Sequence, residues 1–257
     1  YLTNTAVAQE LLFPSRKLTA GPTVTSYITS LGIISDVNDV SIQLLTVPGI
    51  RDRYITDAAI NAVEQDRFDC FYIMDSEQYD VNGTSLTGSY DSVNVSQTAQ
   101  AFVNRGVNSS FAATYFPDVN IVTSTGTVYE KVPPSVAVLG AYAKNDTVGQ
   151  PFNAPAGFTR GTLNNVTDFA VALNQANSDT LYVARINLLL SKQGVGPVVW
   201  GQKTLQNKAS ALDRINVRRL LIKIKKFFAS TSKYLVFEQN VSSTRNKFLS
   251  IVTPYLE

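Results

Sequence analysis

The chain has 257 residues, of which 44% are hydrophobic, so it is long and apolar enough to form a sizeable core. Its formal net charge is only +2, which argues against bulk binding to nucleic acid. It contains no histidine and one cysteine, Cys70, which excludes histidine-dependent catalysis, an intrachain disulfide and the commonest zinc ligand. No apolar run approaches the roughly 20 residues of a membrane-spanning helix, so no membrane partner is expected.

The first segment, residues 1–41, shows no clear periodicity. Threonine, serine and a Gly21-Pro22 pair are scattered among short apolar runs such as residues 24–28. We predict an irregular or weakly β segment here, the remnant of an inserted outer region. The main domain is predicted to occupy residues 42–257.

Strand-like and helix-like patterns alternate after residue 41. Short apolar runs predict strands at 42–47, 68–74, 110–115 and 119–123. Apolar residues at helical spacing predict helices at 53–66 and 92–105, the second ended by Gly106, with a turn-rich stretch at 78–88 between them. Such alternation is typical of βαβ units. We therefore predict an α/β fold, with a mixed, largely parallel sheet flanked by helices.

Proline and glycine divide the middle of the chain. Residues 129–134 indicate a linker that ends in Pro133-Pro134, and this pair can open a helix because the first helical turn needs no N–H donor there. The expected elements are a helix at 135–143, a loop at 145–161 and a helical or mixed segment at 168–187. The linker also suggests a division of the main domain into two subdomains, 42–130 and 131–257.

The strongest helical pattern lies toward the end of the chain, at residues 213–229. A glycine-punctuated apolar run at 193–201 precedes it, and a short extended or helix-exit segment at 234–238 follows it. The pattern predicts a basic face opposite an apolar, core-facing one that comprises Val217, Leu220, Leu221, Ile224, Phe227 and Phe228. A last helix is predicted at 242–256, with inward side chains Phe248, Ile251 and Val252.

The basic face of the 213–229 helix is the candidate interaction surface. Ile215 and Ile222 project into the middle of it, and an isoleucine pair flanked by cations resembles an interface anchor. A solvated face explains the charges equally well. Aromatic side chains for base stacking are missing from this face, so an acidic protein surface suits it better than nucleic acid. The candidate interface residues are Arg218, Arg219, Ile222, Lys223, Lys225 and Lys226.

Motifs that carry chemistry are incomplete. The Gly-x-Gly-Pro run at 194–197 lacks a third glycine in register and a following helix start, so it is no dinucleotide fingerprint. No phosphate-binding loop of the Gly-x-x-x-x-Gly-Lys-Ser/Thr type occurs. The acids Asp66, Asp69 and Asp75 lack the spacing of a magnesium site. We predict no catalytic, cofactor-binding or metal-binding residues.

Several runs, taken in order, resemble the core of bacteriophage contractile tail sheath proteins. The first is YFP at 115–117 with the strand at 119–122, and the second is VPPSVAVLGAYAKND at 132–146. The others are PFNAPAG at 151–157, GVGPVVWGQKTL at 194–205, INVRRL at 215–220 and VFEQN at 236–240. Each run is weak alone, but their order and spacing make the set specific. The resemblance covers roughly residues 42–257, and residues 1–41 add nothing to it.

The resemblance implies a structural protein without enzymatic activity or cofactors. Subunits of that family polymerise around a rigid tail tube, in an extended and metastable state, and contraction drives the tube through the host envelope. The implied partners are copies of the subunit, the tail tube protein, and baseplate and tail terminator proteins, with no nucleic acid and no membrane. The implied location is the virion tail, assembled in the host cytoplasm. The six candidate interface residues would then face the tube or a neighbouring subunit.

The resemblance leaves two further expectations and two alternatives. Family chains continue past this region and exchange terminal arms, so we expect this chain to be a central fragment without arms, folded but monomeric. The first alternative is an α/β nucleotide-binding or enzymatic domain, which predicts a deep polar pocket at the carboxyl ends of the strands. The second is a nucleic-acid-binding module that uses the basic helix.

Overall fold

A five-stranded sheet organises the part of the chain that the computed structural model describes, residues 24–86, 92–122, 129–150 and 152–257. Its strands, in spatial order, are β1 (Leu44–Thr46), β2 (Phe71–Asp75), β5 (Ala112–Phe116), β9 (Asn187–Lys192) and β10 (Gly196–Trp200). The first four are parallel, and β10 returns antiparallel to β9. The prediction of a mixed, largely parallel sheet is therefore confirmed.

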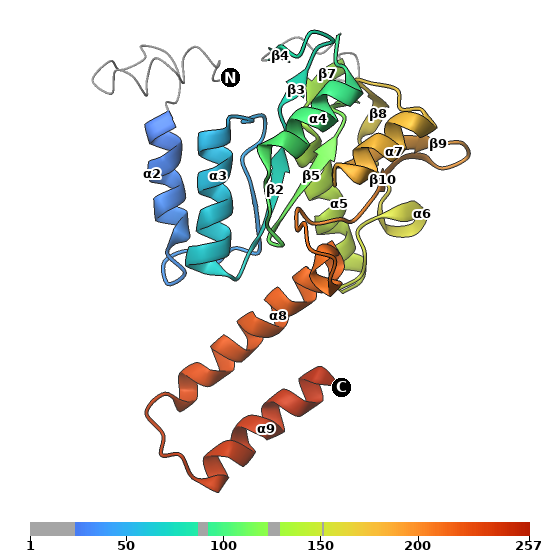
Figure 1. The fold of residues 1–257 in the computed structure, drawn as a ribbon. Helices are drawn as coiled ribbons and strands as arrows, with labels where there is room; N and C mark the ends of the chain where they lie inside the picture. The colour runs from blue at the N-terminus through green and yellow to red at the C-terminus, as the bar shows by residue number, and fades with distance from the viewer. Residues whose placement is uncertain (1–23, 87–91, 123–128, 151) are drawn as a thin grey trace.

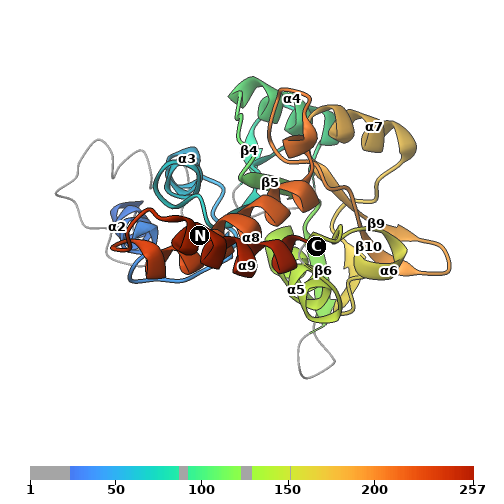
Figure 2. The same cartoon turned by 90° about the horizontal axis from the view of Figure 1, so that it is seen from below.

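Helices cover both sides of this sheet. Figure 2 shows α4 (Val95–Arg105) and α7 (Gln175–Val183) on one side and α5 (Pro134–Val148) on the other. Every residue of β2 and β5 is buried, which is why these strands have continuous apolar runs rather than an alternation.

The predicted helices at 53–66 and 92–105 are both present. Asp52 caps α3 (Arg53–Asn61) by accepting the Tyr54 backbone N–H at 2.9 Å, and the helix continues as a π-helical turn, Ala62–Arg67. Asn94 caps α4 in the same way through the Gln97 N–H, and Gly106, at a φ of 68°, ends it. Local sequence signals thus determine where these helices begin and end.

The first described helix overturns a prediction. Residues 24–35, expected to be irregular or weakly β, form α2 (Val24–Ser35), while residues 1–23 lie outside the described residues. The segment is rich in β-branched residues, which favour strands locally. Packing decides otherwise, because Val24 and Leu31 are buried in the core. The guanidinium of Arg67 also binds the chain just after α2, donating to the Val40 carbonyl at 2.6 Å.

A second sheet contains a stretch that was expected to be a linker. Its strands are β7 (Tyr129–Val132), β6 (Val119–Val122) and β8 (Val166–Phe169), all antiparallel. The linker prediction for residues 129–132 is wrong, because these residues form an edge strand in which Val132 lies opposite Val119. The proline pair that follows the strand suggested a linker instead. The turn-rich stretch at 78–88 contains a small ribbon, β3 (Gln78–Tyr79) with β4 (Ser85–Leu86).

The middle of the chain is more helical than expected. The helix α5 begins at the predicted proline but extends to Val148, and α6 (Gly157–Arg160) lies within the predicted loop. The mixed segment at 168–187 contains the end of β8 and all of α7. The central sheet takes strands from both predicted subdomains, which does not favour a division near residue 130. The division stays a prediction.

The chain ends in a helical hairpin. A 3-10 turn, Ala211–Asp213, leads into α8 (Ile215–Ser232), and a second, Lys233–Leu235, follows it before α9 (Ser242–Leu256). Figures 1 and 2 show α8 crossing one end of the body, with α9 folded back beside it. The contacts of α8 lie before β1, β2 and β5, so the hairpin covers the amino-terminal edge of the parallel strands.

Candidate functional site

The face of α8 that contacts the body is not the predicted one. Its buried residues are Ile215, Arg219 and Ile222, whereas Leu221, assigned to the core face, is 42% exposed. The physical reason is that the body presents carboxylates and backbone carbonyls along the amino-terminal edge of its sheet. The basic side of the helix therefore packs inward, and its apolar side is only partly buried, with Phe227 and Phe228 against α9.

Arg219 anchors the first half of α8. Its guanidinium forms an ion pair with Asp146 of α5 and lies 4.8 Å from the centre of the Tyr142 ring. The Tyr142 hydroxyl in turn bonds to the hydroxyl of Tyr115 on β5 at 2.6 Å. Burial raises the pKa of Tyr142 to about 12, so this hydroxyl stays neutral and can share its proton in the core.

The other cations of α8 also contact their own chain. Arg218 donates to the Ser110 hydroxyl and lies 4.0 Å from the Phe111 ring. Burial lowers the pKa of the Arg218 guanidinium. Lys223 donates to the Gln150 side chain at 2.9 Å, and Lys225 lies 4.3 Å from the ring of Phe68. Lys226 donates to the Ile42 carbonyl at 3.2 Å and lies 3.7 Å from the Asp69 carboxylate.

These contacts show that the six candidate interface residues already interact with the chain's own body. Arg219 and Ile222 are buried against the body, so the prediction that they face outward is wrong. The other four anchor the helix through part of their side chains. Whether any of them also contacts a tube or another subunit stays a prediction.

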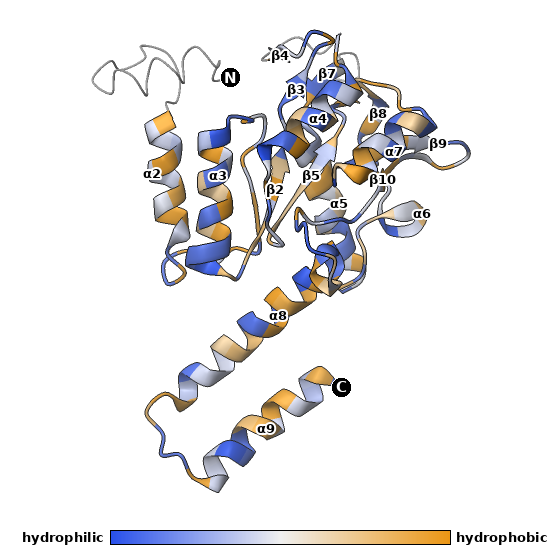
Figure 3. Cartoon of the chain, viewed as in Figure 1, coloured by the Kyte–Doolittle hydropathy of each residue, from blue (hydrophilic) through white to orange (hydrophobic). Residues whose placement is uncertain are grey.

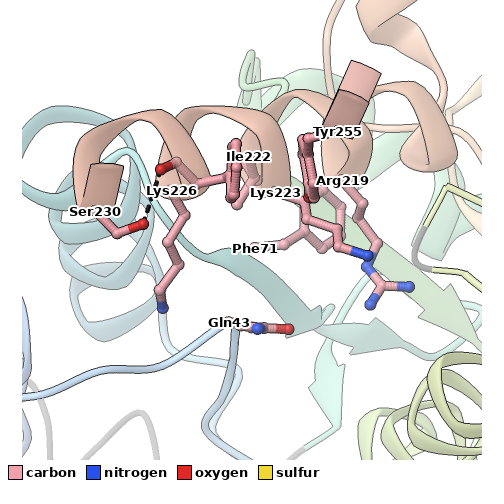
Figure 4. Close-up of a pocket in the computed structure, with 9 residues that line it drawn as sticks. Gln43, Phe71, Arg219, Ile222, Lys223, Lys226, Ser230 and Tyr255 are labelled. Atoms are coloured by element: carbon pink, nitrogen blue, oxygen red, sulfur yellow. Dashed lines mark hydrogen bonds between the residues drawn. The ribbon is translucent and has the colours of Figure 1, made fainter. Parts of the chain in front are cut away.

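A groove of about 320 Å³ runs between α8 and the body. Its floor is apolar and comprises Phe71 of β2, Ile222 and Phe227 of α8, and Tyr255 of α9. Figure 4 shows Lys226 and Arg219 extending from α8 toward the side of the groove where Gln43 lies. The groove thus combines an apolar floor with a positively charged rim.

Aromatic contacts hold α9 against α8. The rings of Phe227 and Tyr255 stack with centroids 3.7 Å apart, and Phe228 meets Phe248 edge-on at 6.3 Å. Val252 is buried, as predicted, but Ile251 is exposed, so its inward assignment is wrong. The inward stripe follows positions 248, 252 and 255, and residue 251 lies to one side of that stripe.

The hairpin has many exposed apolar side chains. Figure 3 shows hydrophobic residues along both of its helices. The exposed ones include Leu221, Tyr234, Val236, Phe237, Leu249, Ile251 and Leu256. Neighbouring exposed apolar residues on one element are typical of protein contact surfaces. The exposed apolar residues at 234–237 were not predicted to form a contact surface. The apolar run just after the helical pattern could have indicated one.

The carboxyl-terminal edge of the sheet, where α/β enzymes bind ligands, contains a buried polar cluster instead. Asp75, at the end of β2, accepts the Gly49 N–H at 2.9 Å and the Ser135 hydroxyl at 2.7 Å. Asp118, after β5, accepts from Arg51 at 2.6 Å and from the Gln78 amide at 2.9 Å. These contacts fix α5 and the loop after β1 to the sheet, so Asp75 and Asp118 have a structural role.

Two searches over the described residues bear on other kinds of site. None of the groups of His, Cys, Asp or Glu in these residues is arranged to hold a metal ion. No helix in the described ranges combines the length and apolar character needed to cross a membrane.

Comparison with known proteins identifies the family. The sequence model of the phage tail sheath protein central domain matches residues 20–205. The chain belongs to the phage tail sheath protein family. The match begins at residue 20, so it includes part of the segment that the sequence analysis left out of the resemblance.

Curated tail sheath proteins agree with this assignment. The tail sheath protein of Enterobacteria phage T4 is 33% identical over 194 residues, which cover 74% of this chain and 29% of that protein. The tail sheath protein of Vibrio phage KVP40 is 43% identical over 125 residues, or 49% of this chain and 19% of that protein. The matched region thus spans less than a third of these tail sheath relatives.

Solved structures share the fold with the tail sheath chain. The contracted PVC sheath complex of an extracellular contractile injection system has a TM-score of 0.70 at 20% identity, covering 89% of this chain and 58% of that one. The contracted helical sheath of the anti-feeding prophage has a TM-score of 0.67 at 24% identity, covering 93% and 59%. Since residues 1–205 alone could not supply such coverage, these matches extend into the α8–α9 hairpin.

Proposed function

We propose that this chain is part of the structural subunit of a bacteriophage contractile tail sheath. Its subunits polymerise around the tail tube, and contraction drives the tube through the host envelope. The observation that carries this proposal is the family match over residues 20–205, supported by 33% identity with the tail sheath protein of phage T4.

The proposed partners follow from this role. They are copies of the subunit, the tail tube protein, and the baseplate and tail terminator proteins at the two ends of the sheath. The anti-feeding prophage baseplate, whose structure includes a chain of this fold, supports the baseplate as a partner. The protein is assembled in the host cytoplasm and resides in the virion tail.

A sheath subunit works through its interfaces rather than through bond chemistry. The polar groups at the carboxyl-terminal edge of the sheet engage one another, which supports a non-enzymatic role. The α8–α9 hairpin, by contrast, has groups free to bind a partner. Its cations hold it to the body, while Leu249 and Ile251 remain exposed. In this proposal the exposed apolar residues of the hairpin contact the tube or a neighbouring subunit, where many modest contacts add up over a polymer.

Electron microscopy of the complete protein that carries this sequence, expressed alone, tests the proposal. We expect tubes of uniform diameter. Replacing Leu249 and Ile251 together with glutamate leaves the fold intact and prevents tube formation, because it places charges in an apolar contact. Val183→Glu, a change at a still more exposed apolar residue on α7, serves as the control and leaves the tubes unchanged. A complete protein that stays monomeric under all assembly conditions contradicts the proposal.

A further inference from the structure

The loop that joins α8 to α9 exposes an unusual amount of apolar surface. Phe237 is 100% exposed, and Tyr234 and Val236 beside it are also largely exposed. The acidic residue Glu238 follows directly and is exposed as well. Figure 1 places this loop at the end of the hairpin, away from the central sheet. Single exposed apolar residues are ordinary, but three large ones within four positions mark a contact surface.

The groove beneath α8 is complementary to this loop, because it is apolar inside and positively charged at its rim. Its apolar lining includes the partly exposed rings of Phe227 and Tyr255 above the buried Phe71, and its volume is about 320 Å³. Lys223 stands at the rim and donates to the neutral amide of Gln150. Lys226 shares the Asp69 carboxylate with Arg67, which binds that carboxylate at 2.9 Å. The rim therefore has more positive charge than its carboxylate partners neutralise.

We propose that Phe237 and Glu238 of one copy dock into the α8 groove of a second copy. Phe237 occupies the apolar floor, and Glu238 lies against Lys223 at the rim. The match of an aromatic anchor to an apolar groove, and of a carboxylate to a lysine, carries the proposal. It rests on the proposed function, because only a chain that assembles with its own copies needs this contact.

The geometry of such a contact suits a polymer. The loop and the groove are different surfaces of one chain, so each copy can donate its loop to one neighbour and accept the loop of another. A head-to-tail contact of this kind builds rings or open helical assemblies. A single contact of this size is weak, so the chain alone stays monomeric when dilute and the contact is tested at high concentration.

Disulfide trapping between two chains, each with one added cysteine, tests the contact. Gln239→Cys places a thiol beside Phe237, and Ser230→Cys places one in the groove lining. Cys70 does not interfere, because burial raises the pKa of its thiol to about 12. A mixture of the two variants is expected to give a heterodimer well above the homodimers of either alone. The absence of such a heterodimer overturns the proposal.

Further changes test which side chains make the contact. Phe237→Ala in the Gln239→Cys chain is expected to lower the heterodimer yield roughly tenfold. The matched control Phe158→Ala, another exposed phenylalanine, leaves it unchanged. Equal losses for the two changes contradict the assigned anchor.

Charge reversal tests the rim. Glu238→Lys on one chain and Lys223→Glu on the other each reduce trapping, and the two reversals together restore it. Lys233→Glu, an exposed reversal outside the groove, is the control. Reversals that fail to restore one another contradict the proposed pairing. If trapping fails while the complete protein still forms tubes, this contact is wrong and the sheath function stands.

Discussion

Asp75 shows how a single buried acid holds this fold together. It accepts hydrogen bonds from Gly49 and Ser135, which lie 26 and 60 residues away in the chain. Burial raises its pKa above the ordinary value of 3.8, while these hydrogen bonds and the charge of Arg51 act in the opposite direction. The sequence marks Asp75 as a strand end, but partners at such separations depend on the tertiary fold.

The raised pKa of Asp75 predicts a pH dependence of stability. The native state binds this proton more tightly than the unfolded state, so the contribution of the protonated carboxyl is fully present below pH 3.8 and is lost as pH rises through the raised pKa. The free energy of unfolding of the natural chain, minus that of Asp75→Asn, is therefore expected to fall as pH rises. Denaturant unfolding across a pH series measures it, with exposed Asp179→Asn as control. A constant difference contradicts the assignment.

At the scale of elements, helix positions could be predicted and helix orientation could not. The period of apolar residues in α8 is strong, so its existence follows from the sequence. Both of its sides contain large apolar residues, however, and the side that packs inward is decided by Asp146 and Asp69 on other elements. The helix α2 is an exception, because its β-branched residues favour strands locally and its position was not predicted.

Two neighbouring residues of α8 test its observed orientation. Ile222 is 6% exposed, so Ile222→Ala is expected to lower the free energy of unfolding by about 2–4 kcal/mol through lost burial and a residual cavity. Leu221 is 42% exposed, so Leu221→Ala is expected to cost less than about 1 kcal/mol. Urea unfolding of both variants measures the two costs. A larger loss for Leu221→Ala indicates that the helix packs by its other side.

At the scale of the whole molecule, the described residues form a body built on the central sheet and a helical hairpin beside it. The largely parallel sheet and its helices form the body, and the α8–α9 hairpin covers one edge of that sheet (Figure 2). Alternating strands and helices predicted the sheet, because that order is typical of parallel pairing. The antiparallel second sheet was not predicted, since the prolines after β7 suggested a linker and β8 follows α5 and α6 in the chain.

The most direct test is a cryo-EM structure of the polymer formed by the complete protein, at a resolution that places side chains. We predict that the exposed apolar residues of the hairpin, including Leu249 and Ile251, are buried against the tube or a neighbouring copy. A polymer in which these residues face solvent contradicts the claim that this chain works through the hairpin.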